Sequence, residues 1–182
     1  LAHVGALASL GLTRRQALWQ VAEVAGRRGP LLADLPPEPA SPLPEMAPLE
    51  ETIADYSGLN LTTGPHLMAY LREDLDARGV VPLAELEARR DGEVVEAAGA
   101  VIVRQRPGTA KGFTFFTVED ETGTVQAIIR PDLYRANRQL IVSSPILLIR
   151  GALQKRDGTL SIKARSFEAL RAEVPMRSHD FH

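Results

Sequence analysis

The sequence predicts an α+β chain in which an N-terminal helical segment precedes a five-stranded antiparallel barrel, with one helix between strands three and four. Three observations carry this prediction. The hydrophobic period changes from about 3.6 to 2 at Val94, where β-branched and aromatic residues take over. Six of the thirteen prolines fall within residues 36–48. Turn-forming residues at 107–111, 120–123 and 157–158 then divide the second part into short segments.

The first region, residues 1–35, contains a helix start. Thr13-Arg14-Arg15-Gln16 fits a capping box with Thr13 as the N-cap, and the apolar residues that follow share one helical face until Gly26. The chain opens at Leu1, without a methionine and inside an apolar pattern. We interpret the sequence as a fragment of a longer protein.

Residues 36–48 are expected to form an extended linker, because proline removes a backbone donor and disrupts helices and central strands. Residues 49–92 are expected to be a helical connector. Within it, Pro65 suits the first turn of a helix that Gly79 closes, and Pro82 begins a last short helix.

The strands are expected at 94–106, 112–119, 124–130, 145–155 and 159–167, with a helix over 131–139. Gly99 marks the point where a long first strand bends to serve both sides of the barrel. Five strands with a helix between the third and fourth are in the order of an OB-fold, which we assign to residues 93–171. An SH3-like or other small barrel is the alternative.

Composition limits the possible functions. The absence of cysteine excludes disulfides, thiolate metal sites and a cysteine nucleophile, and it suits a reducing compartment. The sequence has no membrane-length apolar run and no signal-peptide pattern, so we expect a cytoplasmic protein that does not bind membranes. The net charge of −2 hides an asymmetry: residues 1–93 carry −6, whereas residues 94–171 carry +5. A basic second half favours a nucleic-acid partner.

The second strand offers candidate base-stacking residues. Alternation directs Phe113 and Phe115 to one face and Phe116 and Val118 to the other. Because Phe116 and Val118 are the better core pair, Phe113 and Phe115 are expected on the open face, where each ring could stack on a base. The alternative is that both rings pack against the helical segment 49–90.

Cations flank these rings and would contact phosphates. The candidate nucleic-acid-binding residues are Phe115, Phe113, Arg104, Arg106, Lys111, Arg130, Lys155, Arg156, Lys163 and Arg165. The acidic run Glu119-Asp120-Glu121 could hold Mg²⁺, but we favour a hairpin turn in which Asp120 accepts amide hydrogens. We therefore expect no catalytic residue, metal or cofactor in this segment.

Residues 99–134, GAVIVRQRPGTAKGFTFFTVEDETGTVQAIIRPDLY, resemble the OB domain of bacterial error-prone DNA polymerases, which are C-family enzymes related to the replicative DNA polymerase III alpha subunit. The resemblance continues through residues 143–170 and 55–72. Residues 9–20 look like the end of the family's helix-hairpin-helix region, assigned to 1–35, and residues 178–182 look like the C-terminal tail, assigned to 172–182.

The resemblance implies template-directed nucleotidyl transfer by a parent polymerase, with Mg²⁺ held by aspartates that lie upstream of Leu1 in the family. It also implies a role in DNA replication and DNA repair through damage-induced translesion synthesis and mutagenesis. The partners that it implies are the rest of the polymerase chain and a Y-family-like mutasome protein. For this chain it implies a grip on single-stranded or primer-template DNA. The pattern from Phe115 to Asp120 also resembles the anticodon-binding barrel of class II aminoacyl-tRNA synthetases, whose first aromatic residue stacks on a base. An RNA-binding OB module and a protein-interaction barrel are the alternative functions.

Overall fold

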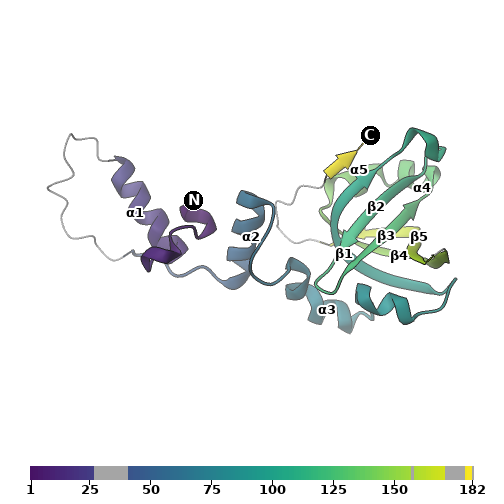
Figure 1. Cartoon of the computed structure of the whole chain (residues 1–182), viewed down its shortest axis with the longest axis horizontal. Helices are drawn as coiled ribbons and strands as arrows, with labels where there is room; N and C mark the ends of the chain where they lie inside the picture. The colour runs from purple at the N-terminus through teal and green to yellow at the C-terminus, as the bar shows by residue number, and fades with distance from the viewer. Residues whose placement is uncertain (27–40, 157, 171–178, 182) are drawn as a thin grey trace. The chain divides into compact units, whose positions relative to one another are not determined.

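The computed structural model describes residues 1–26, 41–156, 158–170 and 179–181 (Figure 1). The chain divides into two compact units, Leu1–Gly64 and Pro65–His182. The predicted connector 49–92 therefore contributes one helix to the first unit and the remaining helical turns to the second. Most of the predicted tail 172–182 and part of the linker 36–48 lie outside the described residues.

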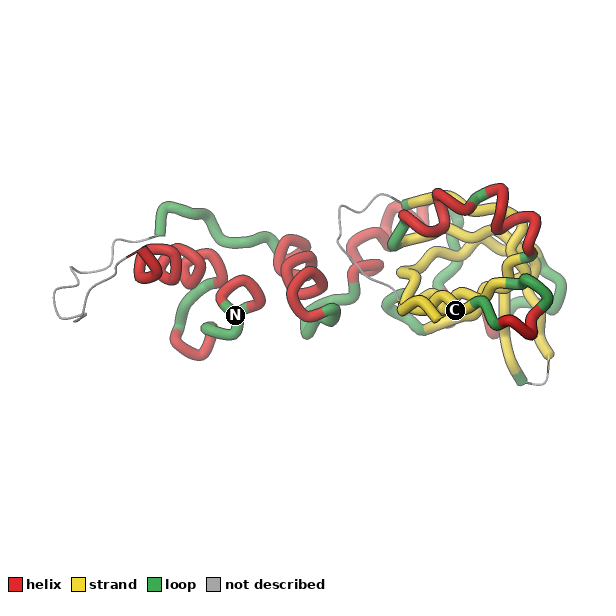
Figure 2. The backbone as a smooth tube through the Cα atoms, turned by 90° about the horizontal axis from the view of Figure 1, so that it is seen from above, coloured by secondary structure: helices red, strands yellow, loops and turns green. Residues whose placement is uncertain are grey.

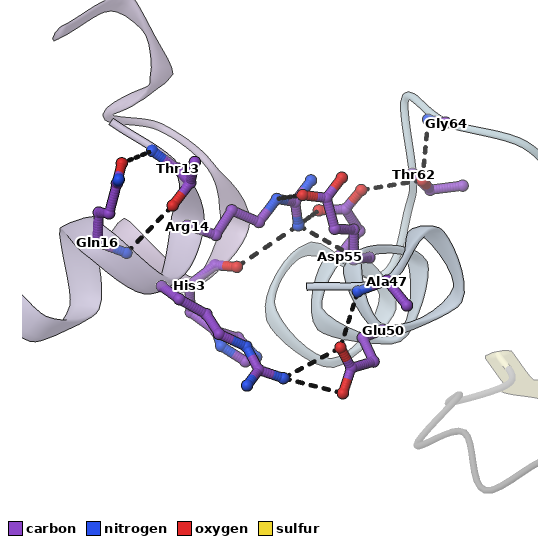
Figure 3. Close-up of polar contacts among 11 residues, drawn as sticks. His3, Thr13, Arg14, Gln16, Ala47, Glu50, Asp55, Thr62 and Gly64 are labelled. Carbon is purple, nitrogen blue, oxygen red and sulfur yellow. Dashed lines mark hydrogen bonds and ion pairs between the residues drawn. The ribbon is translucent and has the colours of Figure 1, made fainter. Parts of the chain in front are cut away.

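The first unit consists of two short 3-10 helices, η1 (Ala2–Val4) and η2 (Ala8–Leu10), and two α-helices, α1 (Arg14–Gly26) and α2 (Pro48–Leu59). The predicted capping box is confirmed. The Thr13 backbone N–H donates to Gln16 Oε1 at 2.9 Å, and the Gln16 N–H donates to Thr13 Oγ1 at 3.3 Å (Figure 3). These two bonds satisfy donors at the start of α1 that have no partner within the helix.

A buried ion pair joins α1 to α2 within this unit. Arg14 donates to Asp55 Oδ1 at 2.6 Å, and Thr62 Oγ1 donates to Asp55 Oδ2 at 2.9 Å (Figure 3). The Asp55 carboxylate is therefore hydrogen-bonded through both oxygens, which offsets the cost of taking its charge out of water.

The second unit begins with helical turns that precede the barrel: η4 (Leu67–Leu71), α3 (Arg72–Ala77) and η5 (Leu83–Ala88). The larger apolar residues that they bury are Leu67, Met68, Leu75, Leu83 and Leu86. Gly79 follows α3 with a φ of +74° and Pro82 caps η5, as the sequence predicts for the end of one helical segment and the start of the next.

Five strands close into a barrel: β1 (Val94–Gln105), β2 (Thr114–Glu119), β3 (Thr124–Ile129), β4 (Ile146–Arg156) and β5 (Thr159–Ala169). They are ordered β2-β3-β5-β4-β1, and β1 returns to pair with β2 (Figure 1). This is the predicted OB-fold order.

The prediction of a fully antiparallel barrel is wrong, because β3 and β5 run parallel. The reason is geometrical. Five is an odd number, so strands that alternate in direction around a closed ring must leave at least one neighbouring pair parallel. The other four pairings of the ring are antiparallel.

The first strand serves both sides of the barrel, as expected. Its first half pairs with β4 up to Ala100, and from Ala100 onward it pairs with β2. A Cβ atom on Gly99 would lie 2.8 Å from the carbonyl oxygen of Glu119. Glycine is therefore required where β1 passes against β2, because a real side chain at this position would clash with backbone.

The connection from β3 to β4 is helical but not a single helix. α4 (Pro131–Ala136) and α5 (Arg138–Ser143) are separated at Asn137 and run alongside the strands (Figure 2). A short strand, β6 (His179–Phe181), pairs in parallel with residues 103–105 of β1.

The barrel interior is apolar, and its largest fully buried side chain is that of Phe116. Val118, Ala127, Ile149 and Ile162 belong to the same core. The expectation that Phe116 and Val118 point inward is confirmed. In the described parts of the chain, no helix combines the length and the apolarity that crossing a bilayer requires.

Candidate nucleic-acid interface

The outer face of the barrel carries a row of side chains that crosses its strands. Register places Phe115 of β2 opposite Ile128 of β3, Ile128 opposite Lys163 of β5, and Lys163 opposite Ala152 of β4. All four side chains are exposed or half-buried, whereas the alternate positions fill the core. Neighbouring strands lie about 4.8 Å apart, so these side chains form one continuous surface.

A groove of about 610 Å³ lies on this face. Its lining residues are Phe113, Ile128, Arg130, Ala152, Lys163, Ala164 and Arg165. Four of the ten predicted site residues therefore meet in one groove, although they come from the residue before β2, the residue after β3 and the middle of β5. Phe115 adjoins the groove through its pairing with Ile128.

The two rings differ from the core phenylalanine in burial. Phe116 is fully buried, whereas Phe113 and Phe115 are half-buried and belong neither to the core cluster nor to the side chains packed against it. Phe113 precedes β2 and is held by its backbone N–H, which donates to the Ala110 carbonyl oxygen at 2.9 Å. Both rings thus keep apolar surface in contact with solvent.

The cations of the groove have few intramolecular partners. Lys163 and Arg165 are exposed, and no hydrogen bond or ion pair of either side chain is found among the residues that the structure describes. Arg130 lies 2.9 Å from Asp132, but both side chains are more than half exposed. Exposed ion pairs contribute about 0–1 kcal/mol, so Arg130 can exchange Asp132 for another anion at low cost.

The environment of Arg104 differs from the exposed cation that the sequence suggests. Its guanidinium donates to the carbonyl oxygens of Ile141 at 3.2 Å and Ser144 at 2.9 Å, and lies 5.5 Å from the centre of the Phe116 ring. Arg104 therefore fixes the end of α5 against β1. Alternation along a strand gives the face of a side chain but not its hydrogen-bond partners, so sequence reasoning could not detect this role.

The remaining predicted cations lie outside the groove. Arg106 is exposed, with its guanidinium 5.5 Å from the centre of the Tyr134 ring, and Lys111 is exposed in the loop between β1 and β2. Lys155 donates through Nζ to the Glu87 carbonyl oxygen. Arg156 is exposed at the end of β4.

Sequence reasoning missed Ile128, Ala152 and Ala164 as groove residues. The signal for Ile128 was present, because the two-residue period of β3 places it on the same face as Gln126 and opposite Val125, Ala127 and Ile129. Ala152 carries no chemical signal of its own. Its position depends on the pairing of β4 with β5, which local sequence does not specify.

The acidic turn after β2 is a hydrogen-bonded structure. The backbone N–H groups of Thr122 and Gly123 donate to Asp120 Oδ1 at 2.7 and 3.0 Å. Leu83 N–H and Arg72 both donate to Asp120 Oδ2 at 2.9 Å. The carboxylate is fully buried and both its oxygens accept hydrogen bonds from protein donors, which favours the turn over a metal site.

Arg72 completes this turn by pairing with Glu121 as well. Burial by itself would lower the pKa of Arg72, but the hydrogen bond that Arg72 donates to Glu121 and the charges of Glu121 and Asp120 raise it. Across the described ranges, no group of three or more histidine, aspartate or glutamate side chains is arranged to hold a metal ion. We call Arg72, Leu83 and residues 120–123 the Asp120 turn.

Comparison with known proteins agrees with this geometry. Residues 92–170 match the family described as an OB-fold nucleic acid binding domain. The whole chain is also similar to proteins named error-prone DNA polymerase. The one from Caulobacter vibrioides is 41% identical over 96% of this chain, and the one from Mycolicibacterium paratuberculosis is 40% identical over 100% of it. The chain spans about 17% of the length of each.

Among solved structures, asparaginyl-tRNA synthetase from Pyrococcus horikoshii is 21% identical, with a TM-score of 0.44, over 51% of this chain and 23% of its own. The proteins named error-prone DNA polymerase match at about 40% identity over 96–100% of this chain. The resemblance to bacterial error-prone DNA polymerases that the sequence predicts is therefore confirmed, and the part of this chain that matches the OB-fold family is residues 92–170.

Proposed function

We propose that this chain is the single-stranded DNA-binding portion of an error-prone DNA polymerase, and that its barrel grips the template strand. The observation that carries the proposal is the outer face of the barrel, where half-exposed rings adjoin cations that have few protein partners. Rings stack on bases and cations contact phosphates, so one face offers both kinds of contact that a nucleic-acid strand needs.

Single-stranded DNA suits this face better than a duplex. A ring such as Phe115 can stack only on a base whose face is exposed, and duplex bases are stacked on one another. Stacking contributes roughly 1–3 kcal/mol per base and tolerates any sequence. The groove next to Phe115 has the cations Arg130, Lys163 and Arg165 along its length, which supports a phosphate path beside the stacked bases.

We extend the proposal to the longer polymerase of which this chain would be a part. The parent would be a DNA-directed DNA polymerase that performs nucleotidyl transfer in the cytoplasm during damage-induced translesion synthesis. Its Mg²⁺ would be held by aspartates outside this chain, and a Y-family-like mutasome protein would be a partner. This segment would supply template contacts and no chemistry.

Fluorescence anisotropy with labelled oligonucleotides tests the proposal. We expect the 182-residue chain to bind a thymidine 15-mer at low salt and to lose affinity steeply as salt rises, because each phosphate contact releases counterions. It should incorporate no nucleotide. A folded sample that fails to bind at low salt would refute the proposal.

The same assay separates the other two functions. An RNA-binding module would prefer a uridine 15-mer to the thymidine 15-mer, because the 2′-hydroxyl is the group that distinguishes RNA from DNA. A protein-interaction barrel would bind neither oligonucleotide. We expect equal or tighter binding of the DNA.

A further inference from the structure

The helices between β3 and β4 carry a second basic surface that the groove on the outer face does not include. A surface hollow of about 580 Å³ is lined by Arg135, Ala136, Arg138, Gln139, Val142 and Ser143 of α4 and α5. We call these residues the α4–α5 strip. Within α5, Gln139, Val142 and Ser143 are spaced by three and four positions and lie on one helical face. Arg135 and Ala136 extend the strip to the end of α4.

The charges of the strip have no acidic partner. Arg135 and Arg138 are exposed, and within the described residues neither makes an ion pair or a side-chain hydrogen bond. The nearest acidic residue in sequence, Asp132, pairs with Arg130 instead. Two unpaired arginines beside the exposed side chain of Val142 leave a surface that fits an anionic chain with some apolar surface.

The strip is held rigidly from beneath. Ile141 is fully buried in the barrel core, and Arg104 donates to the carbonyl oxygens of Ile141 and Ser144. A cation at a helix C-terminus satisfies carbonyl groups that have no partner within the helix. Arg104 therefore fixes α5 before any ligand arrives, which lowers the cost of ordering the strip on binding.

Arg130 connects the strip to the groove on the outer face. It lines that groove and is also the N-cap residue of α4. Arg130, Arg135 at the end of α4 and Arg138 at the start of α5 therefore follow one another along the connection that leaves the groove.

We propose that the α4–α5 strip is a second phosphate-binding surface, which holds the nucleotides that leave the outer-face groove past Arg130. This inference rests on the proposed function, because it extends the path of the same DNA strand. It also predicts a longer footprint than the groove alone allows. A short oligonucleotide would fill the groove, and only a longer one would reach Arg135 and Arg138.

Oligonucleotide length separates the two surfaces. The test compares a thymidine 5-mer with a thymidine 15-mer on the unaltered chain and on the double variant R135E/R138E. The matched control, R90E/R150E, makes the same charge change at exposed arginines outside both the groove and the strip. Relative to the control, we expect about tenfold weaker binding of the 15-mer and unchanged binding of the 5-mer.

The salt dependence gives an independent measurement. Loss of two single-strand phosphate contacts should reduce the slope of log affinity against log salt by about 1.4 for the 15-mer. If the unaltered chain binds both oligonucleotides and R135E/R138E matches the control on each, the strip does not bind DNA, while the proposed function stands. The same result is expected if the strip instead holds an acidic protein segment. If the unaltered chain binds neither, both proposals fail.

Discussion

The Asp120 turn and the outer-face groove belong to the same barrel and use the same kinds of charged residue, but in opposite ways. At the turn, Arg72 meets Asp120 and Glu121, and the Asp120 carboxylate receives protein donors at both oxygens. In the groove, Lys163 and Arg165 are exposed and unpaired among the described residues. Partners, rather than residue type, thus distinguish a charge that stabilises the fold from one available to a ligand.

The difference in burial and in hydrogen-bond partners predicts how strongly a mutation at each place should affect stability. A buried, fully hydrogen-bonded charge is costly to disturb, because its removal leaves the opposite charge without a partner. Removing an exposed cation changes the free energy of unfolding very little. Its loss should be detected in the affinity for an anionic ligand. Stability should therefore respond at the turn, and DNA affinity should respond at the groove.

The largest effect is expected from Asp120→Ala. The change leaves Arg72 and four backbone or hydroxyl donors without their acceptor, so we expect the free energy of unfolding to fall by about 3–5 kcal/mol. Urea denaturation followed by far-ultraviolet circular dichroism measures it. The control is Asp132→Ala, which removes an exposed carboxylate and should cost less than about 0.5 kcal/mol. Equal losses in the two variants would contradict the distinction between turn and surface.

The two neighbouring phenylalanines of β2 are expected to differ in the same way. Phe115 should affect DNA affinity, and Phe116 should affect the free energy of unfolding. Phe115→Ala is expected to weaken binding of a thymidine 15-mer by about 1–3 kcal/mol, because one stacking platform is lost, with a smaller change in unfolding free energy. Phe116→Ala is the control for burial and should cost about 3–5 kcal/mol of stability. Anisotropy and urea denaturation on both variants give the comparison. Unchanged DNA affinity in a folded Phe115→Ala variant would remove the ring from the interface.

The alternation of side chains along the strands could be predicted from sequence, and so could the strand order. Period-2 reasoning identified Phe116 as core and Phe115 as outward, because alternation is a local property of extended backbone. The parallel pairing of β3 with β5 follows from closing an odd number of strands. It joins two strands that are not consecutive in the sequence, so the local pattern does not reveal it.

The partners of individual cations could not be predicted. Arg104 and Lys163 are both cations within predicted strands, and nothing in the local sequence distinguishes them. Arg104 nevertheless donates to the carbonyl oxygens of Ile141 and Ser144, which follow it by 37 and 40 positions. Such contacts depend on where α5 ends over β1, which is a tertiary property. The Asp120 turn shows the same limit: its hairpin part was expected, but its bonds to Arg72 and Leu83, 48 and 37 positions earlier, were not.

The cations of the groove should affect binding less than the ring does. Lys163→Gln with Arg165→Gln removes two exposed charges and should weaken binding of the thymidine 15-mer roughly fivefold at low salt. The salt slope should fall by about 1.4. Arg90→Gln with Arg150→Gln is the matched control, and the stability of both double variants should be unchanged. An unaltered salt slope in the Lys163 and Arg165 variant would show that these side chains do not contact phosphates.

The smallest effect is expected in the first unit, at Asp55. Like Asp120, Asp55 is a buried carboxylate that receives protein donors at both oxygens. Burial would raise the pKa of Asp55, but hydrogen bonds from Arg14 and Thr62 outweigh it and lower the pKa below the ordinary value of 3.8. A carboxylate with a lowered pKa in the folded state stabilises that state above its unfolded pKa. The contribution is lost as pH falls through the folded value.

The stability difference between the unaltered chain and Asp55→Asn should therefore be largest near neutral pH and shrink progressively below about pH 4. Trp19 is the only tryptophan of the chain and lies on α1, so its fluorescence during urea denaturation reports on the first unit alone. Glu45→Gln, at an exposed position, is the control and should show no such convergence. A difference that stayed constant from pH 7 to pH 3 would mean that Asp55 contributes through packing rather than through its charge, and the parallel between the two buried carboxylates would fail.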